Sequence, residues 1–327
     1  MSQSRSLHRA LVVALSLCLP GCSRTEKEKR EQPPPQQSGV RAAAPKPELL
    51  YLPEGGDIAL EREPAHELLP GPWTARSTRC PPEMVDVRGQ FCIDRFEVSL
   101  VDRVSGRELS PYYHPTPGQL KRCYAGWQAR RLDTGSGRAR SLPIPPPPAW
   151  QLEEPFTPRA RALPGVVPSG YLSGHVADEA CRNAGKRLCR LEEWQMACRG
   201  QTGRKFPYGD QYQAEACNVA REAHPAQLLH GNASINHLDP RLNLVQHDER
   251  PLLRNTGATP SCRSVWGEDA VFDMAGNLDE WVDDPDGTFA GGFYSRGTHE
   301  GCDALITSHD FAYFDYSLGT RCCKNPP

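Results

Sequence analysis

The chain has 327 residues, a formal net charge of −2 and a pI of about 6.6. This balance carries no overall basic surplus of the kind that points to nucleic acid or to an anionic membrane surface. A hydrophobic content of 38% is enough for a buried core, and the 32 prolines favour long irregular segments over regular helices and strands.

The N-terminus has the layout of an export signal. Arg5, His8 and Arg9 precede an apolar run of about 9 residues, which is too short to span a bilayer because a spanning helix needs about 20. The run ends in Leu19-Pro20-Gly21-Cys22, which resembles a bacterial lipobox although proline is unusual at its position. We therefore expect residues 1–21 to be a lipoprotein signal peptide and Cys22 to be lipidated, with a plain cleaved signal as the alternative.

The next segment, residues 22–78, lacks any periodic apolar pattern. Its sequence TEKEKREQPPPQQSGVRAAAPKPE is charged and rich in proline and glutamine, so it buries too little surface to offset the entropy of ordering. We expect a disordered tether that holds a domain off a membrane. The predicted location is the bacterial cell envelope, with the lipid anchor in the outer membrane and the domain facing the periplasm or the exterior.

The cysteine count supports export. Of 13 cysteines, 11 remain once Cys18 in the signal and Cys22 at the lipid are set aside. Eleven free thiols are not expected in an exported domain, so the count predicts several disulfides and at least one unpaired cysteine. The sequence contains no C-x-x-C and no cysteine–histidine cluster with zinc spacing.

The first ordered elements are expected at residues 84–102. Alternating apolar residues predict a strand, a turn at Arg88-Gly89 and a second strand. Asp94 and Glu97 are close enough for a carboxylate pair, but in a short strand such residues more often accept hydrogen bonds from a neighbouring loop.

Residues 103–170 are expected to form a long irregular excursion at the surface. Their PIPPPP run, residues 143–148, favours an extended conformation. The aromatic residues here either form a stacking surface for sugars or anchor the loop on the core, and we favour anchoring. They are Tyr112, Tyr113, Tyr124, Trp127 and Trp150.

The clearest helical pattern covers residues 173–200. Ser173 suits an N-cap, apolar residues recur at helical spacing after it, and Gly185 suits the position just past the helix end. A second helix is expected after Arg190. Cys181 and Cys198 would then lie on consecutive helices that face one core.

From this point the chain resembles the formylglycine-generating, sulfatase-modifying family. The resemblance runs from about Met84 to Cys323 and rests on motifs in the family's order, with residues 103–170 unmatched. It implies an α+β fold, a variant of the C-type lectin fold with little regular secondary structure, over residues 79–325. The motifs are GKRLCRLEEWQMACRG (185–200), FPYGD (206–210), CNV (217–219), VFDMAGNLDEWVDD (271–284), GG (291–292) and LGTRCC (318–323).

The resemblance also implies bound calcium, because family enzymes bind it at the FDMAGNLDEW loop. Here Asp273 and Glu280 would give side-chain oxygens, and Gly276 and Leu278 backbone carbonyls. An ordinary turn with capping carboxylates is the alternative. A second family site would begin at Asn218 and Val219, and its acidic partner is not recognisable in this sequence.

Two disulfides follow from the same resemblance. Family members link the two cysteines of the helix pair to the C-terminal strands, which here implies Cys181–Cys322 and Cys198–Cys302. The sequence leaves the remaining pairings open, namely those of Cys80, Cys92, Cys123, Cys189, Cys217, Cys262 and Cys323.

The family's oxidases use copper, dioxygen and two active-site cysteines to oxidise a substrate cysteine. Counted from Gly292, the matching positions hold Arg296 and Gly301; if Cys302 is instead aligned with a structural cysteine, they fall on Gly292 and Gly297. Neither register contains the thiol pair that Cu(I) requires, so copper is not expected. No catalytic residue is assigned.

Two functions remain. The favoured one is a membrane-tethered, non-catalytic module with structural calcium that binds an exported protein, peptide or glycan, and not nucleic acid. The alternative is an oxidoreductase of the formylglycine-generating type, or a related metal-dependent oxidase, that modifies exported proteins. Only family membership supports the alternative, since the histidines form no iron-binding motif.

Overall fold

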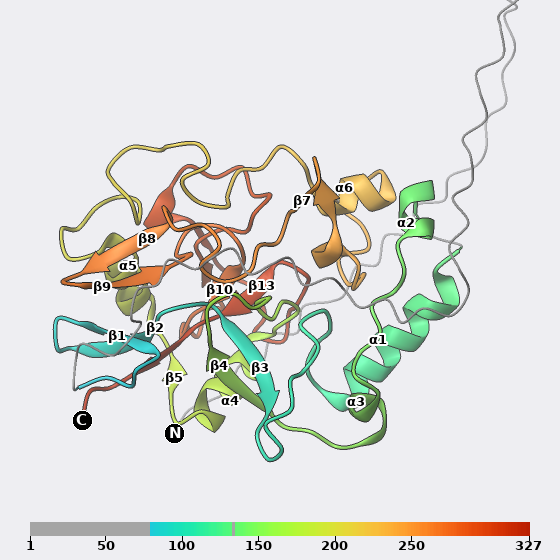
Figure 1. The fold of residues 1–327 in the computed structure, drawn as a ribbon, viewed down its shortest axis with the longest axis horizontal. Coiled ribbons are helices and arrows are strands. Elements are labelled where there is room, and N and C mark those ends of the chain that lie inside the picture. Colours follow the sequence, from blue (N-terminus) through green and yellow to red (C-terminus); the bar gives the residue numbers. More distant parts are fainter. Residues whose placement is uncertain (1–78, 133–134) are drawn as a thin grey trace, which may run out of the picture. The chain divides into compact units, whose positions relative to one another are not determined.

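Strands from distant parts of the chain meet in two four-stranded sheets (Figure 1). The computed structural model describes residues 79–132 and 135–327, so the predicted signal peptide, Cys22 and the tether lie outside the described residues. One sheet has the order β1-β2-β14-β5 and the other β12-β11-β10-β13, and three two-stranded sheets accompany them. The only parallel pair in these described sheets is β10 with β13.

The strands are short. Their bounds are β1 Met84–Val87, β2 Phe91–Asp94, β3 Val98–Asp102, β4 Pro158–Ala162, β5 Arg187–Leu188, β6 Gln246–His247, β7 Arg250–Pro251, β8 Arg263–Trp266, β9 Asp269–Phe272, β10 Asp279–Trp281, β11 Phe289–Ala290, β12 Leu305–Ile306, β13 Leu318–Thr320 and β14 Cys322–Lys324.

The helices are few and mostly short. They are α1 Pro117–Arg130, α2 Gly137–Ser141, α3 Ala149–Glu153, α4 Gly174–Asn183, α5 Leu191–Arg199 and α6 Pro225–His230, with 3-10 turns at Leu242–Leu244 and Gly301–Asp303. No helix within the described ranges is long and apolar enough to cross a membrane.

The helix pair predicted at residues 173–200 is present as α4 and α5. The Ser173 side chain caps α4 by accepting from the Val176 N–H, and Gly185 follows the helix with φ of +70°. The predicted strand, turn and strand at residues 84–102 are also present, with the second strand interrupted between β2 and β3. Asp94 and Glu97 lie at this interruption and accept hydrogen bonds from distant segments, as the structural interpretation expected.

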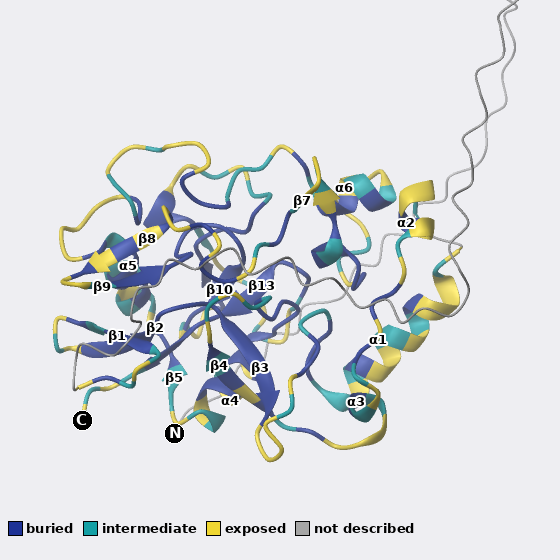
Figure 2. Cartoon of the chain, viewed as in Figure 1, coloured by how far each residue is buried: buried dark blue, intermediate teal, exposed yellow. Residues whose placement is uncertain are grey.

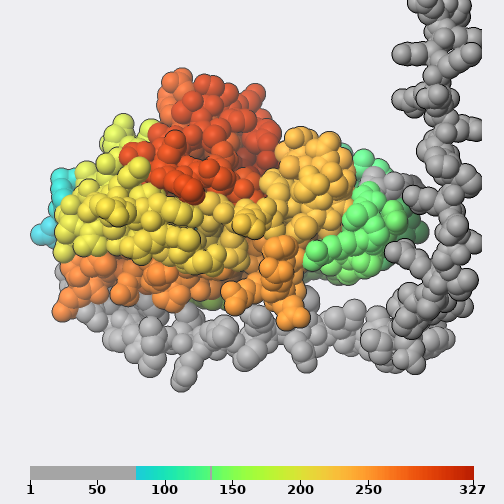
Figure 3. Space-filling view, turned by 90° about the horizontal axis from the view of Figure 1, so that it is seen from above, coloured from blue at the N-terminus to red at the C-terminus, as the bar shows by residue number. Residues whose placement is uncertain are grey.

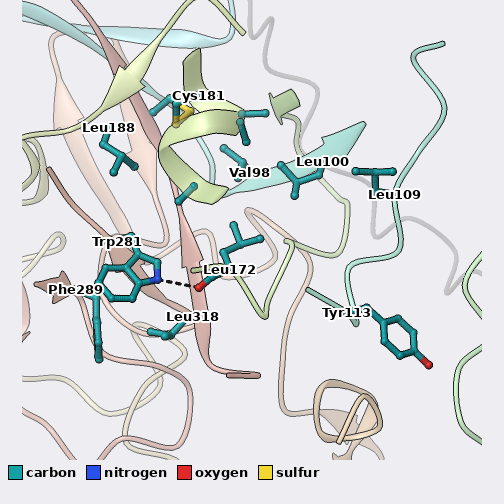
Figure 4. Packing of buried hydrophobic residues seen from close by; sticks show 14 of the residues in the cluster. Val98, Leu100, Leu109, Tyr113, Leu172, Cys181, Leu188, Trp281, Phe289 and Leu318 are labelled. Atoms are coloured by element: carbon teal, nitrogen blue, oxygen red, sulfur yellow. Dashed lines mark hydrogen bonds between the residues drawn. A yellow bond between two sulfur atoms is a disulfide. The ribbon is translucent and has the colours of Figure 1, made fainter. Parts of the chain in front are cut away.

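Buried residues are distributed through the domain (Figure 2), and one of its three large core clusters packs around α4 and the neighbouring strands (Figure 4). Trp281 on β10 is fully buried and donates from Nε1 to the Leu172 carbonyl at 2.8 Å. Phe289 and Leu318 from the flanking strands pack in the same cluster. Helix α5 supplies Trp194 to a second cluster beside it. The C-terminal end of the FDMAGNLDEW loop is therefore held by the buried ring of Trp281.

The expectation of an irregular excursion over residues 103–170 was wrong in one respect. The segment contains α1, the longest helix in the described part of the chain, and β4, which pairs with β3. Helix α1 forms because Leu120, Tyr124 and Trp127 recur at helical spacing and turn one face to the core. Proline at the start of the helix is compatible with it, since the first turn needs no N–H donor there.

The aromatic residues of this segment anchor it. Tyr113 and Trp127 are buried, and the Tyr113 hydroxyl donates to the Pro145 carbonyl at 2.6 Å. Tyr112, Tyr124 and Trp150 are partly buried against the core cluster. These side chains are therefore not a free stacking surface.

Candidate functional site

Three loops meet at the centre of the domain. Residues 218–224 and 291–298 run side by side, with the Ala220 and Arg221 N–H groups donating to the carbonyls of Arg296 and Tyr294 at 3.0 Å each. The loop 273–278 joins them through Gly276, whose N–H donates to the Gly291 carbonyl at 2.9 Å. A Cβ at Gly276 would overlap the Asn218 carbonyl, and its φ is +82°, so only glycine fits. We call this meeting point the loop junction.

Asn277 is the hydrogen-bonding centre of the loop junction. Its φ is +62°, its Nδ2 donates to Glu97 at 2.6 Å, and its Oδ1 accepts from the Asn218 side chain and the Arg254 N–H at 3.0 Å each. Glu97 also accepts from the Leu278 N–H at 3.0 Å. One asparagine thus joins four chain segments, and Glu97 positions the loop from about 180 residues away.

Three buried carboxylates lie around one buried guanidinium beside this junction. Arg321 donates from Nε and Nη2 to the two oxygens of Glu280 at 2.7 and 2.6 Å, and Trp194 donates to Glu280 at 2.7 Å. Burial raises the pKa of Glu97 well above its usual value, and the charges of Asp273 and Glu280 raise it further. Burial likewise raises the pKa of Asp273. The cluster holds more carboxylates than its one arginine neutralises.

This charge imbalance bears on the first calcium set. Asp273 accepts one hydrogen bond, from the Gly257 N–H at 2.6 Å; the charge of Glu280 raises its pKa and that of Arg321 lowers it. Glu280 is less suited to a metal because both of its oxygens already accept hydrogen bonds from Arg321 and Trp194. The excess of buried carboxylates and the Asp273 side chain suit a cation at this first calcium set. Glu280 would have to share its oxygens between the cation and the Arg321 guanidinium.

The second calcium set contains an oxygen without a partner. Asn218 donates from Nδ2 to Asn277 and to the Leu252 carbonyl, which fixes its orientation, and its buried Oδ1 has no hydrogen-bond partner within residues 79–132 and 135–327. Such an orphaned oxygen is compatible with a cation ligand. Among the described residues, no group of three or more His, Cys, Asp or Glu side chains is placed to hold a metal.

The positions that the family resemblance aligns with the oxidase cysteines hold no thiol. Arg296 donates from Nη2 to the buried Asp279 at 2.5 Å, and its guanidinium lies 5.5 Å from the Phe293 ring centroid. Gly301 opens the 3-10 turn with φ of +62°. The other register places Gly292 and Gly297 there. The residues present do not fit a Cu(I) site.

Ten of the eleven cysteines in the described residues are paired. The bridges Cys181–Cys322 and Cys198–Cys302 are the two pairs that the family resemblance implied. The others, which the sequence left open, are Cys80–Cys92, Cys189–Cys323 and Cys217–Cys262.

The free cysteine is Cys123 on α1. Burial raises the pKa of its thiol to about 12, and the charge of Asp239 contributes. Its Sγ donates to the Leu238 carbonyl at 3.5 Å. Because the thiolate is the metal ligand and nucleophile, this thiol is poorly suited to either role.

A polar and aromatic group that the sequence did not indicate surrounds Arg296. Burial raises the pKa of Asp279 to about 7, although the charge of Arg296 acts against the shift. Asp315, which adds to the negative field at Asp279, accepts from the Tyr313 hydroxyl at 2.8 Å and from the Ser317 side chain at 2.7 Å.

Two histidines border the same group. His237 lies with Nδ1 3.9 Å from Asp315, and the Tyr316 hydroxyl is 3.1 Å from Nε2 of His224. Arg296, Tyr313 and His237 keep about a third of their side-chain or residue area exposed, so the group reaches solvent. We call these residues the Arg296 face: Arg296, Asp279, Tyr313, Asp315, Tyr316, His224 and His237.

A scan of protein families matches residues 167–306 to the "Sulfatase-modifying factor enzyme 1-like domain". The match covers 140 of the 327 residues, and over them the chain is similar to that domain. The match agrees with the motifs and confirms the expected fold class, an α+β fold of the formylglycine-generating-enzyme type.

Solved structures give more distant similarities. The Major Tropism Determinant I1 variant is 13% identical with a TM-score of 0.35, covering 76% of this chain and 53% of its own, so the chain spans about half of that protein. CarF is 14% identical with a TM-score of 0.34, covering 72% and 86%. PvdO from Pseudomonas aeruginosa is 14% identical with a TM-score of 0.30, covering 72% and 94%. A search of curated proteins found no match.

Proposed function

We propose that this protein is an exported, membrane-tethered sulfatase-modifying-factor-like domain that binds a ligand and does not oxidise cysteine. The observation that carries the proposal is the ion pair between Arg296 and Asp279. In one of the two registers that the family resemblance allows, Arg296 stands where the family's oxidases have the first copper-binding cysteine, and in the other Gly292 stands there. A guanidinium cannot replace a thiolate toward Cu(I), which requires soft ligands.

The remaining cysteines support the same conclusion. A copper site of the family's type needs two neighbouring thiolates, and ten of the described cysteines are committed to disulfides. Cys123 lies on a different element, alone, with a raised pKa. The described cysteines thus serve as cross-links, and none of them is placed to bind copper in a pair.

The Arg296 face suits recognition of an exported protein or peptide, with a glycan as the other ligand class. It combines a partly exposed arginine with tyrosine and histidine side chains that their neighbours hold in place. Arginine and tyrosine are the residue types that contribute most often to binding energy at protein interfaces. Because Asp279 and Asp315 fix the polar groups in advance, little side-chain entropy would be lost on binding.

Calcium at the loop junction is part of the proposal. A divalent cation beside Asp273 would offset the excess of buried carboxylate, and Asn218 offers an unpartnered oxygen near the same junction. We expect calcium at about 100 times its dissociation constant to stabilise the fold by roughly 3 kcal/mol. Calorimetry should show the rise in melting temperature in the unmodified protein and its loss in Asp273→Asn.

Asp273→Asn is a better test of calcium than a change at Glu280, because Glu280 is also the partner of the buried Arg321. A melting temperature that calcium leaves unchanged in the unmodified protein would refute the site. The tether is tested separately: Cys22→Ala should release the protein from the membrane fraction, and an unchanged distribution would contradict lipidation.

The proposed function is tested by turnover and by binding. The full chain is incubated with Cu(I), a reductant, dioxygen and a peptide with a sulfatase cysteine motif, and mass spectrometry follows the peptide. We expect no formylglycine; formation of formylglycine would overturn the proposal in favour of the oxidase. In parallel, arrays of peptides and of glycans are probed with the unmodified chain, with Arg296→Ala and with the control Arg204→Ala.

Binding that Arg296→Ala loses and Arg204→Ala keeps would support the proposal and identify the ligand class. Arg204 is an exposed arginine outside the Arg296 face, so its loss removes a charge without touching that face. Binding that is insensitive to Arg296 would contradict the assignment of this face.

A further inference from the structure

The segment between Glu108 and Glu153, which lies outside the family match, carries a concentrated positive charge. Between Glu108 and Glu153 the sequence has six lysine or arginine residues and one acidic residue, Asp133, although the whole chain has a net charge of −2. All six lie on or directly beside α1 and α2. They are Lys121, Arg122, Arg130, Arg131, Arg138 and Arg140. We call them the basic face.

The basic face is open to solvent. Five of the six residues are exposed and Arg131 is partly buried, and Figure 2 shows exposed positions along α1 and α2. In the space-filling view of Figure 3 the atoms of this segment, in green, lie together at one end of the described domain. Leu132 projects beside these charges with 69% of its area exposed.

Their electrostatic surroundings differ from those of the surface arginines that are paired with a carboxylate. Arg107, Arg161 and Arg187 each form an ion pair with a glutamate. On the basic face, Arg131 and Arg140 donate instead to backbone carbonyls, of Arg140 and Gly135.

Within the described residues, no acidic side chain forms an ion pair with Lys121, Arg122, Arg131, Arg138 or Arg140. Arg130 lies over the Trp127 ring at 4.4 Å from its centroid. Lys121, Arg122, Arg131, Arg138 and Arg140 therefore have no carboxylate partner in the described part of the chain.

We propose that the basic face docks the domain on a bilayer that contains anionic phospholipid headgroups. Five of the six cations are arginines, which bind phosphate with two parallel hydrogen bonds, and an exposed leucine beside basic residues suits a headgroup layer. The charges are spread along two helices, which matches an extended array of phosphates better than one small anion. The inference does not depend on the ligand of the Arg296 face or on lipidation of Cys22.

Docking of this kind would orient a tethered domain. A lipid anchor or a basic patch alone gives reversible attachment, and two such signals together hold a protein stably on a membrane. Because the basic face belongs to α1 and α2, it would place these helices toward the lipid. The Arg296 face is formed by other elements of the chain.

The test is co-flotation with vesicles, using the full chain with Cys22→Ser so that no lipid can be attached. One set of vesicles contains phosphatidylglycerol and phosphatidylethanolamine, and the other phosphatidylcholine alone. We expect binding to the anionic vesicles at low salt and its loss at 0.5 M salt, where screening over about 4 Å removes the attraction. Neutralising Lys121, Arg122 and Arg138 to Gln should lower partitioning about 100-fold, at about fivefold per charge.

The matched control neutralises Arg159, Arg204 and Arg263 to Gln, three exposed arginines outside the basic face. It should keep most of the binding, since its total charge change is the same. Equal loss in both triple variants, equal binding to phosphatidylcholine, or no binding to either vesicle would overturn the proposal. Binding to soluble polyglutamate with none to anionic vesicles would also overturn it, in favour of an acidic protein segment as the occupant.

Discussion

The disulfide-bonded part of the domain and residues 103–170 are held in place by different interactions. Three bridges join the segment that contains α4, β5 and α5 to the C-terminal part of the chain and close long loops: Cys181–Cys322, Cys189–Cys323 and Cys198–Cys302. Residues 103–170 contain no bridge, and their one cysteine is free. Buried aromatic side chains and a strand pairing with β3 hold this segment.

The difference indicates where sequence change is constrained. In the cross-linked part, a buried ion pair, a junction asparagine and the bridges depend on one another over separations of 41 to 181 residues. In residues 103–170, a few buried aromatic side chains hold the segment on the core. Its solvent-exposed residues include the basic face. The part that the family model matches carries most of the bridged cysteines, and residues 108–153, outside the match, carry the basic face.

The largest effect is expected from removing the longest bridge. Cys181→Ala with Cys322→Ala frees a loop of 141 residues, which in the chain-entropy model costs about 5 kcal/mol of unfolding free energy. Denaturant unfolding measures the loss. Cys123→Ser is the matched control because Cys123 has no bridge, and it should change stability by less than about 1 kcal/mol. Similar losses in the two variants would contradict the comparison.

The next effect concerns the buried ion pair. Glu280→Gln keeps the shape of the side chain but removes the carboxylate that accepts two hydrogen bonds from the buried Arg321 guanidinium, which should cost about 3–5 kcal/mol. Asp303→Asn is the control, since its ion pair with Arg199 is exposed and should contribute less than about 1 kcal/mol. A loss at Glu280 as small as that at Asp303 would show that the pair is solvated.

In residues 103–170 we expect an anchor to matter most. Trp127→Ala removes a buried indole between α1 and the core, which should cost about 3 kcal/mol. Limited proteolysis should show early cleavage within residues 103–170 while the bridged part stays intact. The reason is that no disulfide links residues 103–170 to the bridged part, so this segment can unfold by itself. Simultaneous cleavage throughout the domain would show that the two parts unfold as one unit.

The smallest effect lies where the two parts touch. His114 is buried, with one ring nitrogen 3.3 Å from the Ser173 hydroxyl that caps α4 and the other 3.1 Å from Thr116. Burial lowers the pKa of His114 to about 4. In the unfolded chain the pKa is about 6.5, so the unfolded state binds more protons between these values. The contribution of neutral His114 is therefore present above pH 6.5 and lost as the pH falls toward 4.

Between pH 7 and pH 5 the unmodified protein should consequently lose about 2 kcal/mol more stability than His114→Gln. Other groups also titrate in this range, so the difference between the two proteins is the quantity to measure. Parallel pH profiles for the two proteins would show that His114 does not contribute.

Much of the cross-linked part could be predicted from the sequence because its signals are local or shared with the family. Ser173 and Gly185 bound α4 through cap chemistry, and the motif order led to the bridges at Cys181 and Cys198. Helix α1 was missed because the proline-rich surroundings outweighed the spacing of Leu120, Tyr124 and Trp127. The contacts of Glu97 with Asn277 and of Arg296 with Asp279 depend on how distant loops fold together.

The central claim is that the cysteines of this domain are cross-links and that no thiol pair is available for oxidase chemistry. It is tested most directly by unfolding the full chain without reductant in the presence of an alkylating reagent and locating the labelled cysteines by peptide mass spectrometry. Within residues 79–327 we predict one labelled site, Cys123. A stoichiometrically labelled pair among the other ten cysteines would contradict the account.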